Sequence, residues 1–442
     1  MDTNKALILL ALGGLMAVTP AARAQMTGET VRHHRIQEEW DPALVPAVIQ
    51  AEKAIDIDDY VTAENKLRRV VADDDTNYRA WFDLGYVYTA THREADAIAA
   101  YRKSIAAKPD LFESNLNLGI LLGEAKNPEA ETYLRAATKL KPNGPPEQGW
   151  ERAWLSLAHV LENHKPEEAA AAYREAAKLQ PADLEPHLAA GLMFEKQNRF
   201  ADAEREYQQA AELNPKSVEA MAGLVNVYTQ TQRLPEAEKM LRRYLELNPQ
   251  NAVAHLQLGR VLMARGNPAD ARAEYEAALK LAPNDVEAQR ELAGLDLAAG
   301  HYGEAAQRYQ ALVQKRPTDP DLHYALGNAL LHARDFPAAQ QALLETVKLK
   351  PDLGPAYGDL AMAASENKQY QLTVRALDAR AKLLPETPGT YFLRATAYDN
   401  LKVFKQAAEN YRQFLQAAQG KFPDQEWQAR HRLIAIDPKN NK

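Results

Sequence analysis

Short apolar stretches that end in a proline recur along most of the chain. Seven of these prolines are spaced 34 residues apart: Pro181, Pro215, Pro249, Pro283, Pro317, Pro351 and Pro385. Pro109 and Pro142 precede them at a spacing of 33, and 39 residues separate Pro142 from Pro181. Proline cannot continue a helix, and it disfavours helix in the residue before it. Each proline therefore marks a predicted helix end, and the spacing predicts a tandem repeat.

Small and bulky residues keep fixed places within this repeat. With the prolines at position 32, eleven units begin near residues 44, 78, 112, 151, 184, 218, 252, 286, 320, 354 and 388. Position 8 is glycine or alanine in ten units, with Val225 as the exception. Position 20 is alanine in most units, with Thr373 as the clear exception, and position 24 is usually leucine or tyrosine. Glycine inside a helix costs about 1 kcal/mol relative to alanine, so its recurrence indicates close helix contact. The pattern predicts two short antiparallel helices per unit, which touch at small residues beside a bulky one.

An isolated pair of this kind cannot bury its apolar faces, so neighbouring pairs must stack. The clearest copy reads Trp81-x2-Leu84-Gly85-x2-Tyr88, followed by Ala97, Tyr101 and Pro109. These residues resemble the tetratricopeptide repeat (TPR) family over about residues 44–421. The resemblance implies an all-α fold, a right-handed superhelical solenoid of antiparallel helix pairs. It also implies a concave groove, lined by the first helix of each pair, that holds peptides, helices or partner domains.

Two segments depart from the regular repeat. Residues 145–150 are predicted to be an irregular connector between units 1–3 (44–144) and units 4–11 (151–421), because three prolines and two glycines cluster in residues 142–150. This connector either projects with Trp150 exposed or is a tolerated insertion with Trp150 against a neighbouring helix. Residues 422–442 are predicted to be a capping helix and tail. Trp427, His431 and Ile434 share one face of that helix, which we expect to cover the last apolar face of the stack.

The N-terminus has the parts of a secretory signal peptide in residues 1–24. Lys5 precedes a 13-residue apolar run, Ala6 to Val18, and a small-x-small site ends at Ala24. The run is shorter than the roughly 20 residues that span a bilayer. We expect cleavage after Ala24 and a periplasmic or secreted protein, with an uncleaved anchor as the alternative. Residues 25–43 are predicted to be a disordered or loosely docked N-terminal arm.

Composition and motifs exclude several classes of function. The net charge is -7, and no strongly basic domain indicates nucleic acid binding. There is no cysteine, which removes thiol chemistry and cysteine-ligated zinc. The sequence has no phosphate-binding loop, dinucleotide fingerprint, zinc-protease motif or nucleophile elbow. His33-His34 lies in the arm without carboxylates in a fixed geometry, so we expect no metal, no cofactor and no catalysis.

The resemblance places positions 2, 5, 9, 12 and 13 of each unit on the groove. In this chain the candidate protein-binding residues are Arg79, Phe82, Tyr86, Arg152, His159, Asn226, Thr229, Arg260, Arg290, Tyr324, Asn328 and His332. Asparagine can hydrogen-bond a peptide backbone, arginine can pair with carboxylates through two bonds, and aromatic residues with arginine suit binding hot spots. The alternative is that these residues only form a solvated inner face.

The sequence therefore predicts a non-catalytic protein-binding scaffold, exported, that assembles an envelope or secretion complex. One alternative is a carbohydrate-associated subunit of a polysaccharide export machine, which coplanar Phe82, Tyr86 and Tyr324 would favour. Another is a transferase or hydrolase supported by the repeats, which would need carboxylates or histidines converging in one pocket. Self-association through an uncapped end is a further alternative. No membrane span is expected after cleavage of the signal.

Overall fold

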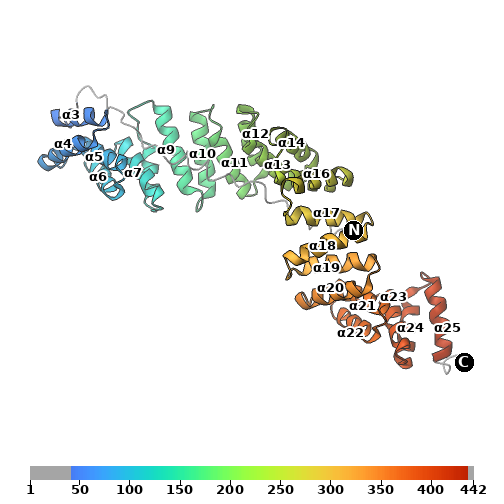
Figure 1. Cartoon of the computed structure of the whole chain (residues 1–442). Helices are drawn as coiled ribbons and strands as arrows, with labels where there is room; N and C mark the ends of the chain where they lie inside the picture. The colour runs from blue at the N-terminus through green and yellow to red at the C-terminus, as the bar shows by residue number, and fades with distance from the viewer. Residues whose placement is uncertain (1–40, 437–442) are drawn as a thin grey trace. The chain divides into compact units, whose positions relative to one another are not determined.

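The structure, a computed structural model, describes residues 41–436 as helices without strands (Figure 1). The helices follow one another as antiparallel pairs, so the expected all-α solenoid is confirmed. The chain divides into an N-terminal unit, residues 1–250, and a C-terminal unit, residues 251–442. The predicted signal peptide, residues 25–40 of the predicted arm and the tail from residue 437 lie outside the described residues.

The described part of the N-terminal unit, from residue 41, contains six helix pairs. They are α3 (Pro46–Ile55) with α4 (Tyr60–Asp73), α5 (Tyr78–Ala90) with α6 (Glu94–Ala107), α7 (Phe112–Glu124) with α8 (Ala130–Ala137), α9 (Pro146–Leu161) with α10 (Pro166–Leu179), α11 (Glu185–Lys196) with α12 (Phe200–Leu213), and α13 (Val218–Gln230) with α14 (Leu234–Leu247).

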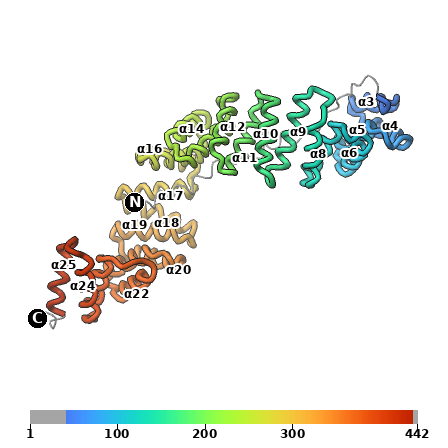
Figure 2. The backbone as a smooth tube through the Cα atoms, turned by 180° about the vertical axis from the view of Figure 1, so that it is seen from behind, coloured from blue at the N-terminus to red at the C-terminus, as the bar shows by residue number. Residues whose placement is uncertain are grey.

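The C-terminal unit contains five pairs and one further helix, which ends the described chain (Figure 2). They are α15 (Ala252–Ala264) with α16 (Pro268–Leu281), α17 (Val286–Ala298) with α18 (Tyr302–Lys315), α19 (Pro320–His332) with α20 (Phe336–Leu349), α21 (Gly354–Glu366) with α22 (Tyr370–Ala381), α23 (Pro388–Asn400) with α24 (Phe404–Ala418), and α25 (Pro423–Ile436). None of the helices among the described residues is both long and apolar enough to span a bilayer.

The two helices of a pair meet where the sequence predicts, at position 8. A Cβ atom added to Gly85 would lie 2.6 Å from the ring of Tyr101, and one added to Gly327 would lie 2.6 Å from the side chain of Leu343. Non-bonded carbon atoms cannot approach so closely, so any side chain at these positions would push the helices apart. The residue at position 24 fills the space beside the glycine, and Tyr101 and Leu343 are fully buried.

In ten of the eleven described pairs, the turn between the two helices contains a residue with a positive φ, in the left-handed backbone conformation. These residues are Asp58, His92, Lys126, Asn198, Gln232, Gly266, Gly300, Arg334, Lys368 and Lys402. The next residue donates its N–H to the carbonyl five positions back, as Arg93 does to Tyr88 at 2.7 Å. This hydrogen bond is that of a Schellman motif, which satisfies a carbonyl at the helix end. The turn between α9 and α10 has no such residue, and Lys165 instead donates to Leu161 at 2.8 Å.

The predicted irregular connector is wrong, because α9 already begins at Pro146. Proline is well suited to the first turn of a helix, where its missing N–H costs no hydrogen bond. Trp150 is half-buried, and its Nε1 donates a hydrogen bond to the carbonyl of Leu140 at 2.6 Å. Of the two interpretations of this segment, the one in which Trp150 packs against neighbouring structure is therefore correct.

The face of α25 that contacts the stack also differs from the prediction. Ala429 is buried against α24 in a cluster with Phe414 and Ala418, and Leu433 and Ile436 pack beside it. Trp427 and Ile434 instead are 61% and 56% exposed. Alanine lets the two helices approach closely, whereas Trp427 stacks on His431 of its own helix at a centroid distance of 3.9 Å.

Candidate binding surfaces

The first three predicted groove residues are buried inside the N-terminal unit. Arg79 Nε donates to Glu52 at 2.6 Å, and its Nη1 donates to Asp41 at 3.1 Å. Phe82 packs on Tyr101 with ring centroids 5.9 Å apart, and Tyr86 is also buried. The prediction that these side chains face a binding groove is wrong, because they hold α5 against its neighbours.

The other predicted residues of this unit lie on α9 and α13. Arg152 and His159 are half-buried, and His159 Nδ1 lies 3.8 Å from Glu162 of the same helix end. Thr229 is buried. Asn226 reaches Glu195 of α11, where burial raises the carboxyl pKa and hydrogen bonds from Tyr207 and Asn226 partly oppose that rise.

In the C-terminal unit, the predicted residues of α15 and α17 form an ion-pair cluster. Arg260 is nearly buried, donates from Nε to Glu291 at 2.9 Å, and lies 3.4 Å from Glu287. Arg290 is more exposed and pairs with Glu287 at 2.7 Å. The guanidinium groups are therefore committed to carboxylates of the same unit.

The predicted residues of α19 face α21 and the α17–α18 pair. Asn328 Nδ2 lies 3.5 Å from Asp359 of α21. Burial raises the pKa of the half-buried Tyr324, and the neighbouring charge of Asp359 raises it further. His332 is exposed and stacks on Tyr302 at a centroid distance of 5.0 Å.

A common pattern connects two of these contacts. In each contact, the residue at position 9 lies on the first helix of one pair and reaches an acidic residue on the first helix of the next pair, 31 positions later. Arg260 reaches Glu291, and Asn328 reaches Asp359. The sequence interpretation missed these acidic partners, although an acid at this spacing was visible. Much of the predicted inner face thus serves contact between neighbouring first helices.

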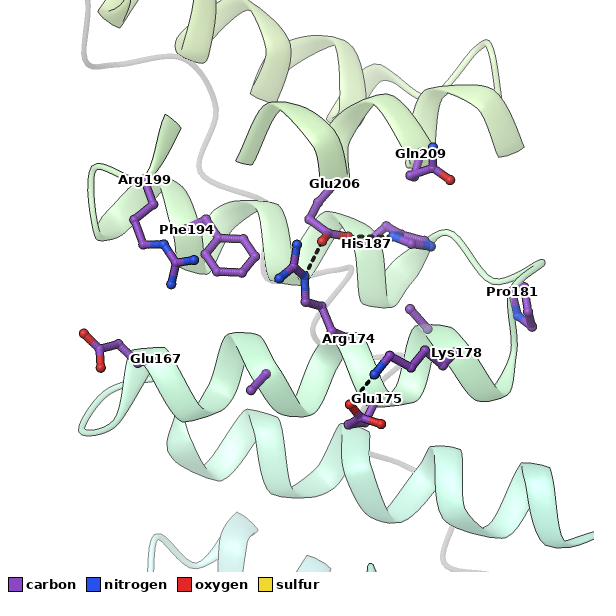
Figure 3. Close-up of a pocket in the computed structure, with 12 residues that line it drawn as sticks. Glu167, Arg174, Glu175, Lys178, Pro181, His187, Phe194, Arg199, Glu206 and Gln209 are labelled. Atoms are coloured by element: carbon purple, nitrogen blue, oxygen red, sulfur yellow. Dashed lines mark hydrogen bonds and ion pairs between the residues drawn. The ribbon is translucent and has the colours of Figure 1, made fainter. Parts of the chain in front are cut away.

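A different surface of the N-terminal unit is hollow. A pocket of about 650 Å³ lies among α10, α11 and α12 (Figure 3). Glu206 of α12 is buried at its wall, where it accepts a hydrogen bond from Arg174 Nε at 2.6 Å and lies 2.8 Å from His187 Nδ1. Burial by itself would raise the pKa of Glu206, but the contacts with His187 and Arg174 outweigh it and lower the pKa.

The pocket also presents an aromatic ring between two cations, as the side chains in Figure 3 show. The guanidinium carbons of Arg174 and Arg199 lie 4.8 and 4.5 Å from the centre of the Phe194 ring. Cation–π contacts at this distance are attractive, so the ring is held in place. Arg199 also pairs with Asp202 near the start of α12, at 2.8 Å from its Nε.

An ion pair that two other helix pairs make is absent at the pocket. Arg93 and Arg233 occupy the same place as Arg199 in other pairs, and each stacks on a tyrosine. Arg93 also bonds Glu64 of the preceding second helix at 3.0 Å, and Arg233 bonds Glu204 at 2.7 Å. Each glutamate lies 29 residues before its arginine. The residue 29 positions before Arg199 is Ala170, which cannot form an ion pair. Arg199, which lines the pocket, therefore has no glutamate at this spacing.

The sequence interpretation did not propose this pocket. The sequence does show that Ala170 stands where the other two arginines have a glutamate 29 residues earlier.

Comparison with protein families agrees with the geometry of the helix pairs. A tetratricopeptide repeat model matches residues 50–111, 158–204, 188–252 and 256–320, and a second one matches residues 296–364. Together they cover more than half of the sequence. The chain belongs to the tetratricopeptide repeat family.

Several solved structures are similar to this chain. YrrB, a TPR protein with an unusual peptide-binding site, is 24% identical, with 45% of this chain and 99% of that one covered and a TM-score of 0.39. Yeast Tom70 is 15% identical over 90% of this chain and 96% of its own, with a TM-score of 0.33. The C-terminal part of a TPR protein from Cytophaga hutchinsonii is 16% identical over 57% and 96%, with a TM-score of 0.44. No curated protein matches the chain.

Proposed function

We propose that this chain is a non-catalytic protein-binding scaffold, and that the pocket among α10, α11 and α12 holds a segment of its partner. The observation that carries the proposal is the open pocket itself, with the guanidinium groups of Arg174 and Arg199 on its wall. Arginine side chains are enriched among residues that dominate binding energy. Tetratricopeptide repeats are typical of scaffolds without catalysis, which supports the same conclusion.

The lining of the pocket indicates the chemistry of the bound segment. Ala171 and Pro181 are exposed apolar residues of the lining, and Arg174 and Arg199 offer guanidinium groups at its edge. An apolar side chain of the partner would contact Ala171 and Pro181, and a neighbouring carboxylate would pair with a guanidinium. We therefore propose a peptide segment in which an apolar residue lies next to an acidic one.

The more exposed predicted groove residues remain proposed secondary contacts. These are Arg152, His159, Arg290 and His332, whose side chains are half-buried or exposed. A carbohydrate track receives no support in the N-terminal unit, because Phe82 and Tyr86 are buried and cannot stack on a sugar.

We further propose that the protein is exported and assembles an envelope or secretion complex. The support is the signal-like pattern of residues 1–24, with its apolar run and the site before Gln25. N-terminal sequencing of the protein recovered from separated cell compartments tests this part. We expect a chain that begins at Gln25 outside the cytoplasm, and an intact Met1 in the cytoplasm would contradict it.

Filling the pocket tests the binding proposal. Ala171 lies exposed on α10 at the pocket, so Ala171→Trp would occupy the hollow without disturbing the buried face of the helix. Ala273 is the exposed residue at the equivalent place on α16, and Ala273→Trp is the matched control. Partners are captured from native extract with each variant, quantified by mass spectrometry, and then measured individually by calorimetry.

We expect Ala171→Trp to lose a partner that wild type and Ala273→Trp both retain. Equal recovery and equal affinity for all three proteins would exclude the pocket as the binding site.

A further inference from the structure

The last described helix of the C-terminal unit is α25 (Figure 1). Its solvent-exposed face carries large apolar side chains. Trp427, His431 and Ile434 follow one another at intervals of four and three residues, so they share one face of the helix. All three are exposed. The opposite face of the same helix packs on α24 through Ala429 and Leu433. These three residues, which we call the α25 stripe, are therefore not part of the core of the unit.

The α25 stripe borders a hollow. Trp427 and His431 line a groove of about 470 Å³ together with Phe392 of α23 and Tyr411 of α24. The groove also contains Arg432, whose guanidinium already bonds Asp399 at 2.8 Å. Aromatic side chains thus surround a space that another side chain can enter, next to an exposed tryptophan.

The charges beside Trp427 are arranged with opposite signs on its two sides. Asp424 precedes Trp427 by three residues, and Arg430 follows it by three, with His431 next. Both Asp424 and Arg430 are exposed, and a guanidinium nitrogen of Arg430 lies 3.6 Å from the carboxylate of Glu426 on its own helix. When a second α25 packs antiparallel with the two Trp427 residues opposite each other, Asp424 of each helix lies opposite Arg430 of the other. A parallel arrangement would instead place like charges together.

We propose that the α25 stripe is a self-association surface, on which α25 of a second copy of this chain packs antiparallel. Trp427 lies near the two-fold axis, where the two indole rings contact each other and the aromatic grooves beside them. Asp424 of each copy pairs with Arg430 of the other. The contact is isologous, since the same patch serves both copies, and it closes as a dimer. It goes beyond the proposed binding function and does not depend on the α10–α12 pocket.

Sedimentation equilibrium of the purified full chain, across a wide concentration range, tests this inference. We expect wild type to approach twice the mass of one chain, and Trp427→Ala to remain monomeric. Met362, an exposed apolar residue of α21, supplies the control: Met362→Ala should associate like wild type. A monomeric wild type at all concentrations would overturn the proposal, and so would a Trp427→Ala variant that still dimerises.

Charge reversal tests the antiparallel arrangement separately. Asp424→Arg and Arg430→Asp each place like charges opposite one another at two symmetric positions, so each should raise the dissociation constant at least about tenfold. The double variant restores opposite charges and should recover the wild-type constant. Both residues are exposed, so circular dichroism should show unchanged folding of all three variants. A double variant that associates no better than the single ones would overturn the antiparallel pairing.

Discussion

Two buried aspartates, one in each unit, show opposite ways of placing a carboxylate inside a helical stack. Asp296 of α17 is surrounded by cations: Arg272 of α16 bonds it at 2.6 Å and Arg308 of α18 at 2.7 Å. Asp83 of α5 is equally buried but lies in an acidic neighbourhood with Glu52, and Arg79 nearby already bonds Glu52 and Asp41.

The surroundings of Asp83 have a clear electrostatic consequence. Burial raises the pKa of its carboxyl well above the ordinary value, and the charge of Glu52 raises it further, against the opposing effect of Arg79. Burial disfavours the charged form of a carboxyl unless countercharges compensate. The comparison teaches that burial alone does not decide the cost of a carboxylate here. The cost also depends on how many nearby cations do not already bond other carboxylates.

The largest effect is expected from neutralising Asp296. Asp296→Asn removes the charge that two guanidinium groups bond, and the remaining amide cannot accept from both equally well. We expect the free energy of unfolding to fall by about 2 kcal/mol. Urea denaturation followed by circular dichroism measures the loss, and hydrogen exchange should localise it to α16–α18. Unchanged protection of these helices would show that the two arginines do not depend on this carboxylate.

The same substitution at Asp83 should have the opposite sign. Asp83→Asn removes a charge that burial disfavours, so we expect a gain of about 1 kcal/mol at neutral pH. A carboxyl with a raised folded-state pKa destabilises the fold when ionised. The gain should therefore be full above that folded-state pKa, shrink as pH falls through it, and vanish below the unfolded-state value near 3.8. Urea titrations at several pH values measure this, and a loss of stability at neutral pH would contradict the comparison.

A solvent-exposed ion pair should give the smallest effect. Arg102 of α6 bonds Glu129 before α8 at 2.6 Å, with both side chains about half exposed. Glu129→Gln should change the free energy of unfolding by no more than about 0.5 kcal/mol, because water and salt screen such pairs. Repeating the measurement at high salt should remove even this difference. An effect as large as that of Asp296→Asn would mean that burial does not determine how much an ion pair contributes to the free energy of unfolding.

Much of the fold could be predicted from the sequence, because the helix pairs repeat their local contacts. Gly85 and Tyr101 lie in contact as positions 8 and 24 require. The start of α9 could not be predicted, since prolines that suggest a connector are also accepted in the first turn of a helix. The orientation of α25 was also missed, because periodicity shows which residues share a face but not which face a neighbour covers.

The candidate site was harder to predict than the fold. Arg79 and Arg260 occupy positions that could face a groove, but nearby carboxylates from the same unit bind them. Such pairing depends on which helices lie side by side, and single positions do not reveal it. The α10–α12 pocket is lined by residues of three helices, and only the assembled pairs show that these residues lie together.

The order in which helices pack has a consequence for folding kinetics. Within each unit the main contacts of a helix are with the next helix along the chain and, more weakly, with the one after. Closing such short loops costs little entropy, and chains with local contacts fold fast. Each pair can therefore serve as a nucleus, and growth proceeds by adding neighbours. Refolding from denaturant should accordingly be rapid for a chain of this length, and a shortened array that keeps several adjacent pairs should refold at a similar rate.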